Sequence, residues 1–150
     1  MKTMQREEVT QLILAAKCAK ALKWADIAAA IGRSKEWTTA ASLGQMTFSA
    51  TQAQALIDLL GLPAEAAAVL QTIPYRGSLP TAVPTDPLIY RFYELVSVYG
   101  TTFKELIGEE FGDGIMSAID FHMDIQRKPD PKGDRVHIVM SGKFLPYKEY

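Results

Sequence analysis

The residues best suited to chemistry are Arg91 and Glu94, which lie three positions apart in a segment rich in aromatic residues, 90–94. On a helix this spacing places both side chains on one face. An arginine fork can hold a small planar anion, and a nearby carboxylate can orient the fork or move a proton. The alternative is an ordinary surface ion pair, worth about 0.5 kcal/mol, and the spacing alone favours it.

Metal binding and thiol chemistry find less support. His122, His137 and the single cysteine Cys18 show no paired spacing typical of metal ligands. Asp120, His122 and Asp124 share one face of an expected strand, but a solvated strand face explains them better, so we expect no metal site. Cys18 lies in an alanine-rich helix without a histidine nearby in sequence, which predicts a buried structural thiol.

Composition limits the class of protein. The chain has 150 residues, 48% of them hydrophobic, and a formal net charge of −1. This length suits one compact domain or two very small ones, and a single cysteine excludes a disulfide-stapled scaffold. Near-neutral charge argues against a nucleic-acid partner. Because no apolar run reaches the roughly 20 residues of a membrane span and no targeting signal is evident, we expect a cytoplasmic protein.

Residues 1–74 are expected to form a bundle of short helices with a role in oligomerisation. Apolar residues recur at helical spacing from Leu12 to Leu22, and no alternation typical of strands occurs. Glycine and serine mark the helix ends: Gly32 and Gly44 as stops, Ser34 as a start, Ser49 or Thr51 as another start, and Gly61-Leu62-Pro63 as the last stop before a short helix at 64–70. A proline-rich link follows.

The segments 24–32 and 34–40 have the length and the turn glycine of a helix-turn-helix. A DNA-binding regulator with a C-terminal dimerisation module is therefore one candidate function. However, residues 1–62 contain seven basic and five acidic side chains and no arginine-rich face. Phosphate recognition requires more positive charge than this, which favours reuse of the helical packing without DNA binding.

Residues 75–150 are expected to form a catalytic and dimerisation domain of helices and strands. Asp86 and Pro87 suit the start of a helix that ends at Gly100, and a second helix is expected from about Thr102 to Gly112. Beyond 112–114, apolar residues alternate over 119–126 and again over 136–140, separated by a loop at 129–134. Ser141-Gly142 is expected to turn the chain into a short edge segment. The overall prediction is an α+β fold whose small sheet is covered by a second copy of the chain.

Several sequence blocks resemble the cyanase family, also called cyanate hydratase or cyanate lyase. The most specific are Arg91-Phe92-Tyr93-Glu94 and Phe111-Gly112-Asp113-Gly114, and the others are 43–45, 73–77, 84–90, 98–102, 115–121 and 142–146. The resemblance covers almost the whole chain. It implies a lyase that combines cyanate with bicarbonate to give carbon dioxide and carbamate, which breaks down to ammonia and carbon dioxide. It also implies that no metal or organic cofactor takes part and that Arg91, Glu94 and Ser117 are catalytic.

The same resemblance implies a decamer of five dimers with active sites between subunits. The C-terminal strands would interlock with those of a partner chain, and the N-terminal bundle would not bind DNA. Ser78 stands where some relatives carry a cysteine, so a thiolate role does not carry over to this chain. A non-catalytic interaction domain, in which Arg91 and Glu94 form only an ion pair, is a further alternative.

Overall fold

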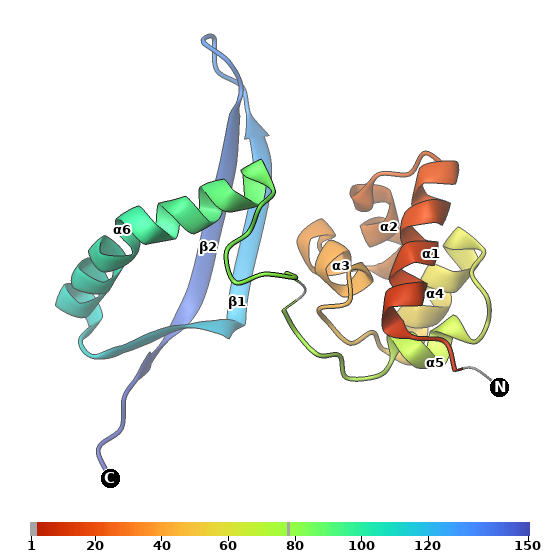
Figure 1. Ribbon diagram of the computed structural model, residues 1–150, viewed down its shortest axis with the longest axis horizontal. Helices are drawn as coiled ribbons and strands as arrows, with labels where there is room; N and C mark the ends of the chain where they lie inside the picture. The colour runs from red at the N-terminus through yellow and green to blue at the C-terminus, as the bar shows by residue number, and fades with distance from the viewer. Residues whose placement is uncertain (1–2, 78) are drawn as a thin grey trace. The chain divides into compact units, whose positions relative to one another are not determined.

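The computed structural model describes residues 3–77 and 79–150, so Ser78 lies outside the described residues. The chain divides into two compact units, residues 1–78 and 79–150. The first unit is helical, whereas the second combines one long helix with an antiparallel hairpin (Figure 1). The expected α+β class is therefore confirmed. None of the helices in the described ranges is long and apolar enough to cross a membrane.

Five helices build the N-terminal unit, and local capping sets their ends. The Ser34 and Ser49 side chains accept hydrogen bonds from the Trp37 and Gln52 amides, while Gly32 and Gly61 end helices at φ values of 78° and 68°. Left-handed backbone at a helix end favours glycine, which explains both stops. The helices are α1 (Arg6–Ala19), α2 (Trp24–Ile31), α3 (Lys35–Ser42), α4 (Ala50–Leu60) and α5 (Ala66–Leu70).

The five helices enclose one hydrophobic core. Val9 and Ile13 of α1, Ile27 of α2 and Leu56 of α4 are all fully buried in it. The helix-turn-helix expected from the sequence is present as α2 and α3, which pack against each other. Cys18 is exposed, so the prediction of a buried thiol is wrong. The core face of α1 follows the spacing of Val9 and Ile13, and a residue five positions beyond Ile13 points well away from that face.

The C-terminal unit begins with a single helix, α6 (Pro87–Phe111). The prediction of two helices separated at Gly100 is therefore wrong. A glycine inside a helix costs about 1 kcal/mol relative to alanine, which is too little to end a helix without a capping motif. Gly100 has no positive φ, whereas Gly112, which does end α6, has a φ of 90°.

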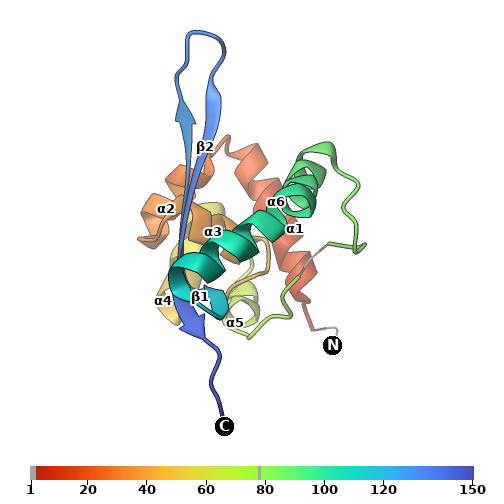
Figure 2. The ribbon, with the colours of Figure 1, turned by 90° about the vertical axis from the view of Figure 1, so that its left-hand side faces the viewer.

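Two long strands follow, β1 (Gly114–Lys128) and β2 (Arg135–Pro146), joined by the turn that the sequence predicts at 129–134. Figure 2 shows the tip of this hairpin extending well beyond α6. The prediction of a turn at Ser141-Gly142 is wrong, because β2 continues through both residues. The irregularity lies instead on β1, between the pairs Met116–Phe144 and Phe121–Gly142.

The C-terminal unit leaves most of its apolar surface uncovered. Helix α6 has no buried residue, and of the described residues in 79–150 only Pro84 and Ser117 are buried. Large apolar side chains are exposed along the whole helix and along both strands. Those on α6 are Leu88, Ile89, Phe92, Tyr93, Leu95, Val96, Val98, Tyr99, Phe103, Leu106 and Phe111.

Candidate active site

The first turns of α6 position Arg91 and Glu94. The Asp86 carboxylate caps the helix by accepting hydrogen bonds from the amides of Leu88 and Ile89, both at 3.0 Å. Pro87 is at the start of the helix, where an N–H group would have no acceptor within the helix, so the absence of an N–H in proline costs no hydrogen bond. The local sequence thus fixes where the helix begins, and the helix then places Arg91 and Glu94 on one face.

Arg91 and Glu94 form an ion pair with 3.6 Å between the arginine Nη1 and the glutamate Oε2. Both side chains are open to solvent, at 62% and 53% exposure. The Arg91 guanidinium also lies over the Tyr90 ring, 5.5 Å from its centroid. One long contact with a carboxylate uses few of the five guanidinium donors, so the fork remains available to an anion.

Ser117 lies in the irregular part of β1. Between the two flanking pairs, residues 117–120 of β1 face only Lys143 of β2, which makes a large bulge. Figure 1 shows β1 turning a corner near its start, and β1 pairs with β2 on both sides of the bulge. Ser117 is 5% exposed. The bulge thus buries a polar side chain in a unit whose other side chains are mostly exposed.

Two backbone amides fix the Ser117 hydroxyl. The N–H groups of Ile119 and Asp120 donate to Oγ, at 3.0 and 2.9 Å. A hydroxyl oxygen has two acceptor positions and one O–H donor. Because the amides occupy both acceptor positions, the remaining capacity of this hydroxyl is to donate. The Ser117 O–H group is therefore left to donate one hydrogen bond.

The structure brings two of the three expected site residues together. Arg91 and Glu94 contact each other on α6. The described hydrogen bonds of Ser117 are with its own bulge, and none connects it to Arg91 or Glu94. In the described residues of a single chain, the three groups therefore do not form one closed pocket.

The strand face that bears Asp120, His122 and Asp124 does not form a metal site. Asp120 lies inside the bulge, whereas His122 and Asp124 lie beyond it in the regular ladder, so the three do not share one register. Among the described residues, no group of three or more histidine, cysteine or acidic side chains is placed to hold a metal ion.

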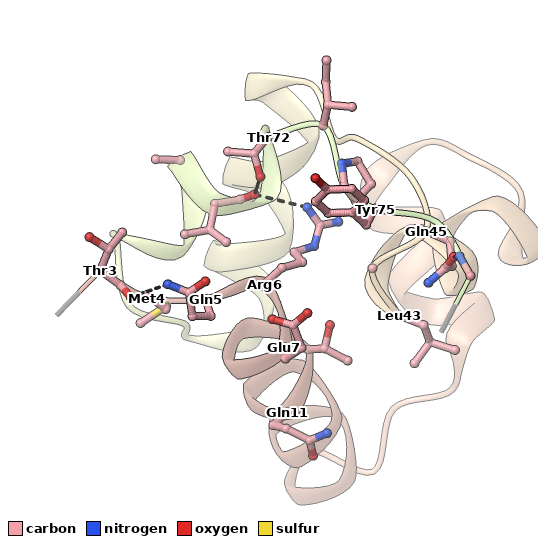
Figure 3. A pocket seen from close by; sticks show the side chains of 17 residues that line it. Thr3, Met4, Gln5, Arg6, Glu7, Gln11, Leu43, Gln45, Thr72 and Tyr75 are labelled. Atoms are coloured by element: carbon pink, nitrogen blue, oxygen red, sulfur yellow. Dashed lines mark hydrogen bonds between the residues drawn. The ribbon is translucent and has the colours of Figure 1, made fainter. Parts of the chain in front are cut away.

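The N-terminal unit contains a pocket of about 670 Å³ beside α1 (Figure 3). Arg6, which the sequence analysis missed, forms part of its wall and donates four hydrogen bonds to backbone carbonyls. They reach Val69 and Leu70 through Nη1, and Ala41 and Met46 through Nη2, at 2.8–3.2 Å. Arg6 therefore ties α1 to three other segments of the bundle.

The environment of Arg6 is that of a structural residue. Burial lowers the pKa of its guanidinium, an effect that Glu7 partly offsets. Its guanidinium carbon lies 5.9 Å from the centroid of the Phe48 ring. The sequence did contain a signal, since Arg6 lies three positions before Val9 and seven before Ile13, on the buried face of α1. The guanidinium serves the fold and not an anion site.

Comparison with known proteins covers both units of the chain. The family model "Cyanate hydratase, N-terminal" matches residues 6–74, and "Cyanate lyase C-terminal domain" matches residues 81–149. A cyanate hydratase of Ralstonia pickettii is 74% identical over 98% of this chain and all of its own length. One of Cupriavidus necator is 68% identical with the same coverage.

A solved structure agrees with these relatives. The crystal structure of cyanase from T. urticae superposes with a TM-score of 0.81 at 40% sequence identity, covering 92% of this chain and 96% of that one. The two family matches together span residues 6–74 and 81–149, and the relatives match 98% of the chain. The chain belongs to the cyanate hydratase (cyanate lyase) family.

Proposed function

We propose that the protein is a cyanate hydratase that decomposes cyanate with bicarbonate to carbon dioxide and carbamate, which then yields ammonia and a second carbon dioxide. The observation that carries this proposal is similarity over the complete chain, at 64–74% identity, to relatives named cyanate hydratase. These relatives are matched over their full length, so the substrate is inferred from entire proteins.

The charges of the substrates define what the site must do. Cyanate and bicarbonate each carry one negative charge, so joining them through a new carbon–oxygen bond gives a dianion. Breaking the bond between the bridging oxygen and the former bicarbonate carbon releases carbon dioxide. The nitrogen must gain two protons to give carbamate, one from bicarbonate and one from outside the two substrates. Carbamate takes a further proton as it releases ammonia. The site therefore has to stabilise two negative charges and deliver protons.

Arg91 is the proposed group for charge stabilisation. Its guanidinium is exposed, permanently cationic and shaped to donate two parallel hydrogen bonds to a planar anion. Donors directed at developing charge contribute the largest single share of catalysis in many enzymes. A ground-state ion pair with Glu94 at 3.6 Å does not prevent this role, because it is long and open to solvent.

Ser117 is the proposed hydrogen-bond donor that fixes one of the anions. The Ile119 and Asp120 amides occupy the acceptor positions of its oxygen, so the O–H group points its proton elsewhere. A group fixed in this way lowers the entropy cost of orienting the reactants. The same two amides withdraw electron density from Oγ, which makes the hydroxyl a stronger donor and a poorer nucleophile.

Glu94 is the proposed orienting and proton-relay group. A carboxylate near two anions is repulsive unless a cation offsets its charge, and Arg91 on the same helix face supplies that cation. The reaction consumes protons, so a carboxyl group close to the nitrogen derived from cyanate can transfer a proton to it. Orientation of Arg91 and proton relay are compatible roles for one side chain.

Assembly is part of the proposal. One Arg91 in each chain provides little positive charge for a dianion, and subunit interfaces can gather several. The apolar side chains left exposed on α6 and the hairpin support burial against other copies of the chain. We therefore propose interlocked hairpins in each dimer and a decamer of five dimers, with the N-terminal bundle aiding oligomerisation.

The proposed reaction uses bicarbonate as a co-substrate and no metal or organic cofactor. We also propose that the enzyme is located in the cytoplasm, as expected from the sequence. A DNA-binding role for α2 and α3 is not favoured, because the relatives at high identity are named as enzymes over their full length.

Ammonia release from cyanate tests the function directly. Purified protein should release ammonia from cyanate when bicarbonate is present and much less after bicarbonate and dissolved carbon dioxide are removed. Two units of carbon dioxide should appear for each ammonia. Release that does not depend on bicarbonate would contradict the co-substrate, and no release under either condition would contradict the function.

A further inference from the structure

The bulge that holds Ser117 depends on close approach of the two strands. Gly142 of β2 pairs with Phe121, the first residue beyond the bulge. A Cβ atom added at Gly142 would overlap the Ser117 carbonyl oxygen and would lie 2.6 Å from the Met116 Cγ. The backbone of β2 therefore occupies the space that any other residue at position 142 would need for its side chain.

A side chain at position 142 would displace Ser117 first. The overlapping atom is a backbone oxygen, which cannot move away by rotation as a flexible side chain can. Moving that carbonyl shifts the peptide between Ser117 and Ala118, and with it the bulge whose amides donate to Oγ. Position 142 is thus coupled to the orientation of the Ser117 hydroxyl.

We propose that Gly142 is a positioning residue for Ser117, an inference that rests on the proposed role of Ser117 in the enzyme. The absence of a side chain lets β2 lie against residues 117–120, which holds the Ser117 oxygen on the Ile119 and Asp120 amides and directs its proton toward the substrate anion. Gly142 itself touches no substrate and acts only through Ser117.

The test compares Gly142→Ala with a matched control, Gly114→Ala. A Cβ at Gly114 would also overlap a backbone carbonyl of the same hairpin, that of Leu145, but its three nearest atoms belong to Phe144 and Leu145 and none to the bulge. Displacement of a reacting group by about 1 Å can lower the rate about 100-fold. We expect Gly142→Ala to lower kcat/KM for cyanate about 100-fold and Gly114→Ala to lower it far less at a similar loss of Tm.

A double-mutant cycle separates positioning from general structural damage. If Gly142 acts through the hydroxyl, Gly142→Ala should cause no further loss of kcat/KM in a Ser117→Ala background. Hydrogen exchange of the intact oligomer should be faster over residues 117–121 in Gly142→Ala than in Gly114→Ala. Losses that add fully in the double variant, or wild-type kcat/KM in folded Gly142→Ala, would overturn the proposal.

Two outcomes distinguish this proposal from the proposed function. If Ser117→Ala keeps wild-type kinetics, the role of Ser117 fails and the positioning role fails with it, even though ammonia release continues. If Ser117→Ala is impaired but the effects are additive, only the role of Gly142 fails. Should Gly142→Ala not fold, Gly142→Ala combined with Met116→Ala replaces it. Failure of both to fold beside a folded Gly114→Ala would overturn the proposal, because the glycine would then serve the whole fold.

Discussion

The two units of this chain differ in how much of their apolar surface they bury. In the N-terminal unit, side chains from α1 to α5 enclose a core in which Val9, Ile13 and Leu56 are fully buried. In the C-terminal unit, the described residues bury only Pro84 and the polar Ser117. The first unit buries a hydrophobic core within one chain. The second unit leaves its apolar side chains exposed, where other copies of the chain can cover them.

The comparison explains where the candidate chemistry lies. The N-terminal unit does contain a pocket of about 670 Å³, but Arg6 in its wall already donates to four backbone carbonyls and offers no open fork to an anion. The unit without a core keeps Arg91 exposed and Ser117 ready to donate. Under the proposed mechanism, a site between chains would gather more than one copy of Arg91 around the dianion.

The largest expected effect concerns the exposed face of α6. Leu106 is 60% exposed in the single chain, so Leu106→Glu should cost the isolated chain little. If this face lies between copies, the change loses about 1.5–3 kcal/mol of apolar burial and adds the larger cost of an unpaired buried carboxylate. We expect sedimentation velocity at micromolar concentration to show an oligomer for the wild type and a monomer for Leu106→Glu.

The control for this variant lies in the N-terminal unit. Leu12 on α1 is also exposed, and the dimer is proposed to form through the hairpins and not through the bundle. Leu12→Glu should therefore give nothing smaller than a dimer. A clean monomer for the wild type, or an unchanged oligomer for Leu106→Glu, would contradict the view that α6 is covered by a second copy.

The next effect distinguishes the two arginines by stability. Arg6→Ala leaves the Met46 carbonyl without a donor among the described residues, whereas the carbonyls of Ala41 and Leu70 keep the amides of Gly44 and Phe48. One unsatisfied carbonyl costs about 1–3 kcal/mol and the other lost hydrogen bonds to a charged group add to this, so we expect a loss of about 2–4 kcal/mol. Chemical denaturation monitored by Trp24 and Trp37 fluorescence should show it. A change below 1 kcal/mol would mean that water replaces these contacts.

Arg91 should show the opposite behaviour. Arg91→Lys keeps the positive charge but loses the planar fork, and removing one donor that stabilises transition-state charge lowers kcat about 100- to 1,000-fold in other enzymes. We expect a loss of this size in bicarbonate-dependent ammonia release. The exposed side chain contributes little to the fold, so Tm and oligomer size should not change. Near-normal turnover would remove Arg91 from the mechanism.

Local signals predicted much of the fold. Ser34, Gly32 and Gly61 mark helix ends because their short-range hydrogen bonds and left-handed backbone need no distant partner. Asp86 and Pro87 start α6 for the same reason. The predictions failed at Gly100, which was interpreted as the end of a helix, and at Ser141-Gly142, which was interpreted as a turn. Helix α6 and strand β2 continue through these positions, and at Gly142 the glycine allows another strand to lie against its backbone.

The candidate site was less predictable because it depends on register. The spacing of Arg91 and Glu94 indicates one helix face, and the ion pair between them agrees with it. Nothing in the alternation of β1 revealed that residues 117–120 leave the ladder, since a bulge is defined by the opposite strand. The two amides that hold the Ser117 oxygen belong to that bulge, so this arrangement could be recognised only in the structure.

The smallest expected effect tests whether α6 is one continuous helix. A Cβ at Gly100 would meet only the Val96 Cγ1, at 3.7 Å, and at Gly108 it would meet nothing within 4 Å. Alanine is better than glycine in a helix interior by about 0.5–1 kcal/mol, so Gly100→Ala and Gly108→Ala should each raise Tm by about 2–4 °C. If only Gly100→Ala lowers Tm while Gly108→Ala raises it, the helix is continuous but a second chain approaches its backbone at Gly100. The packing of the C-terminal unit would then depend on another chain even at a single glycine.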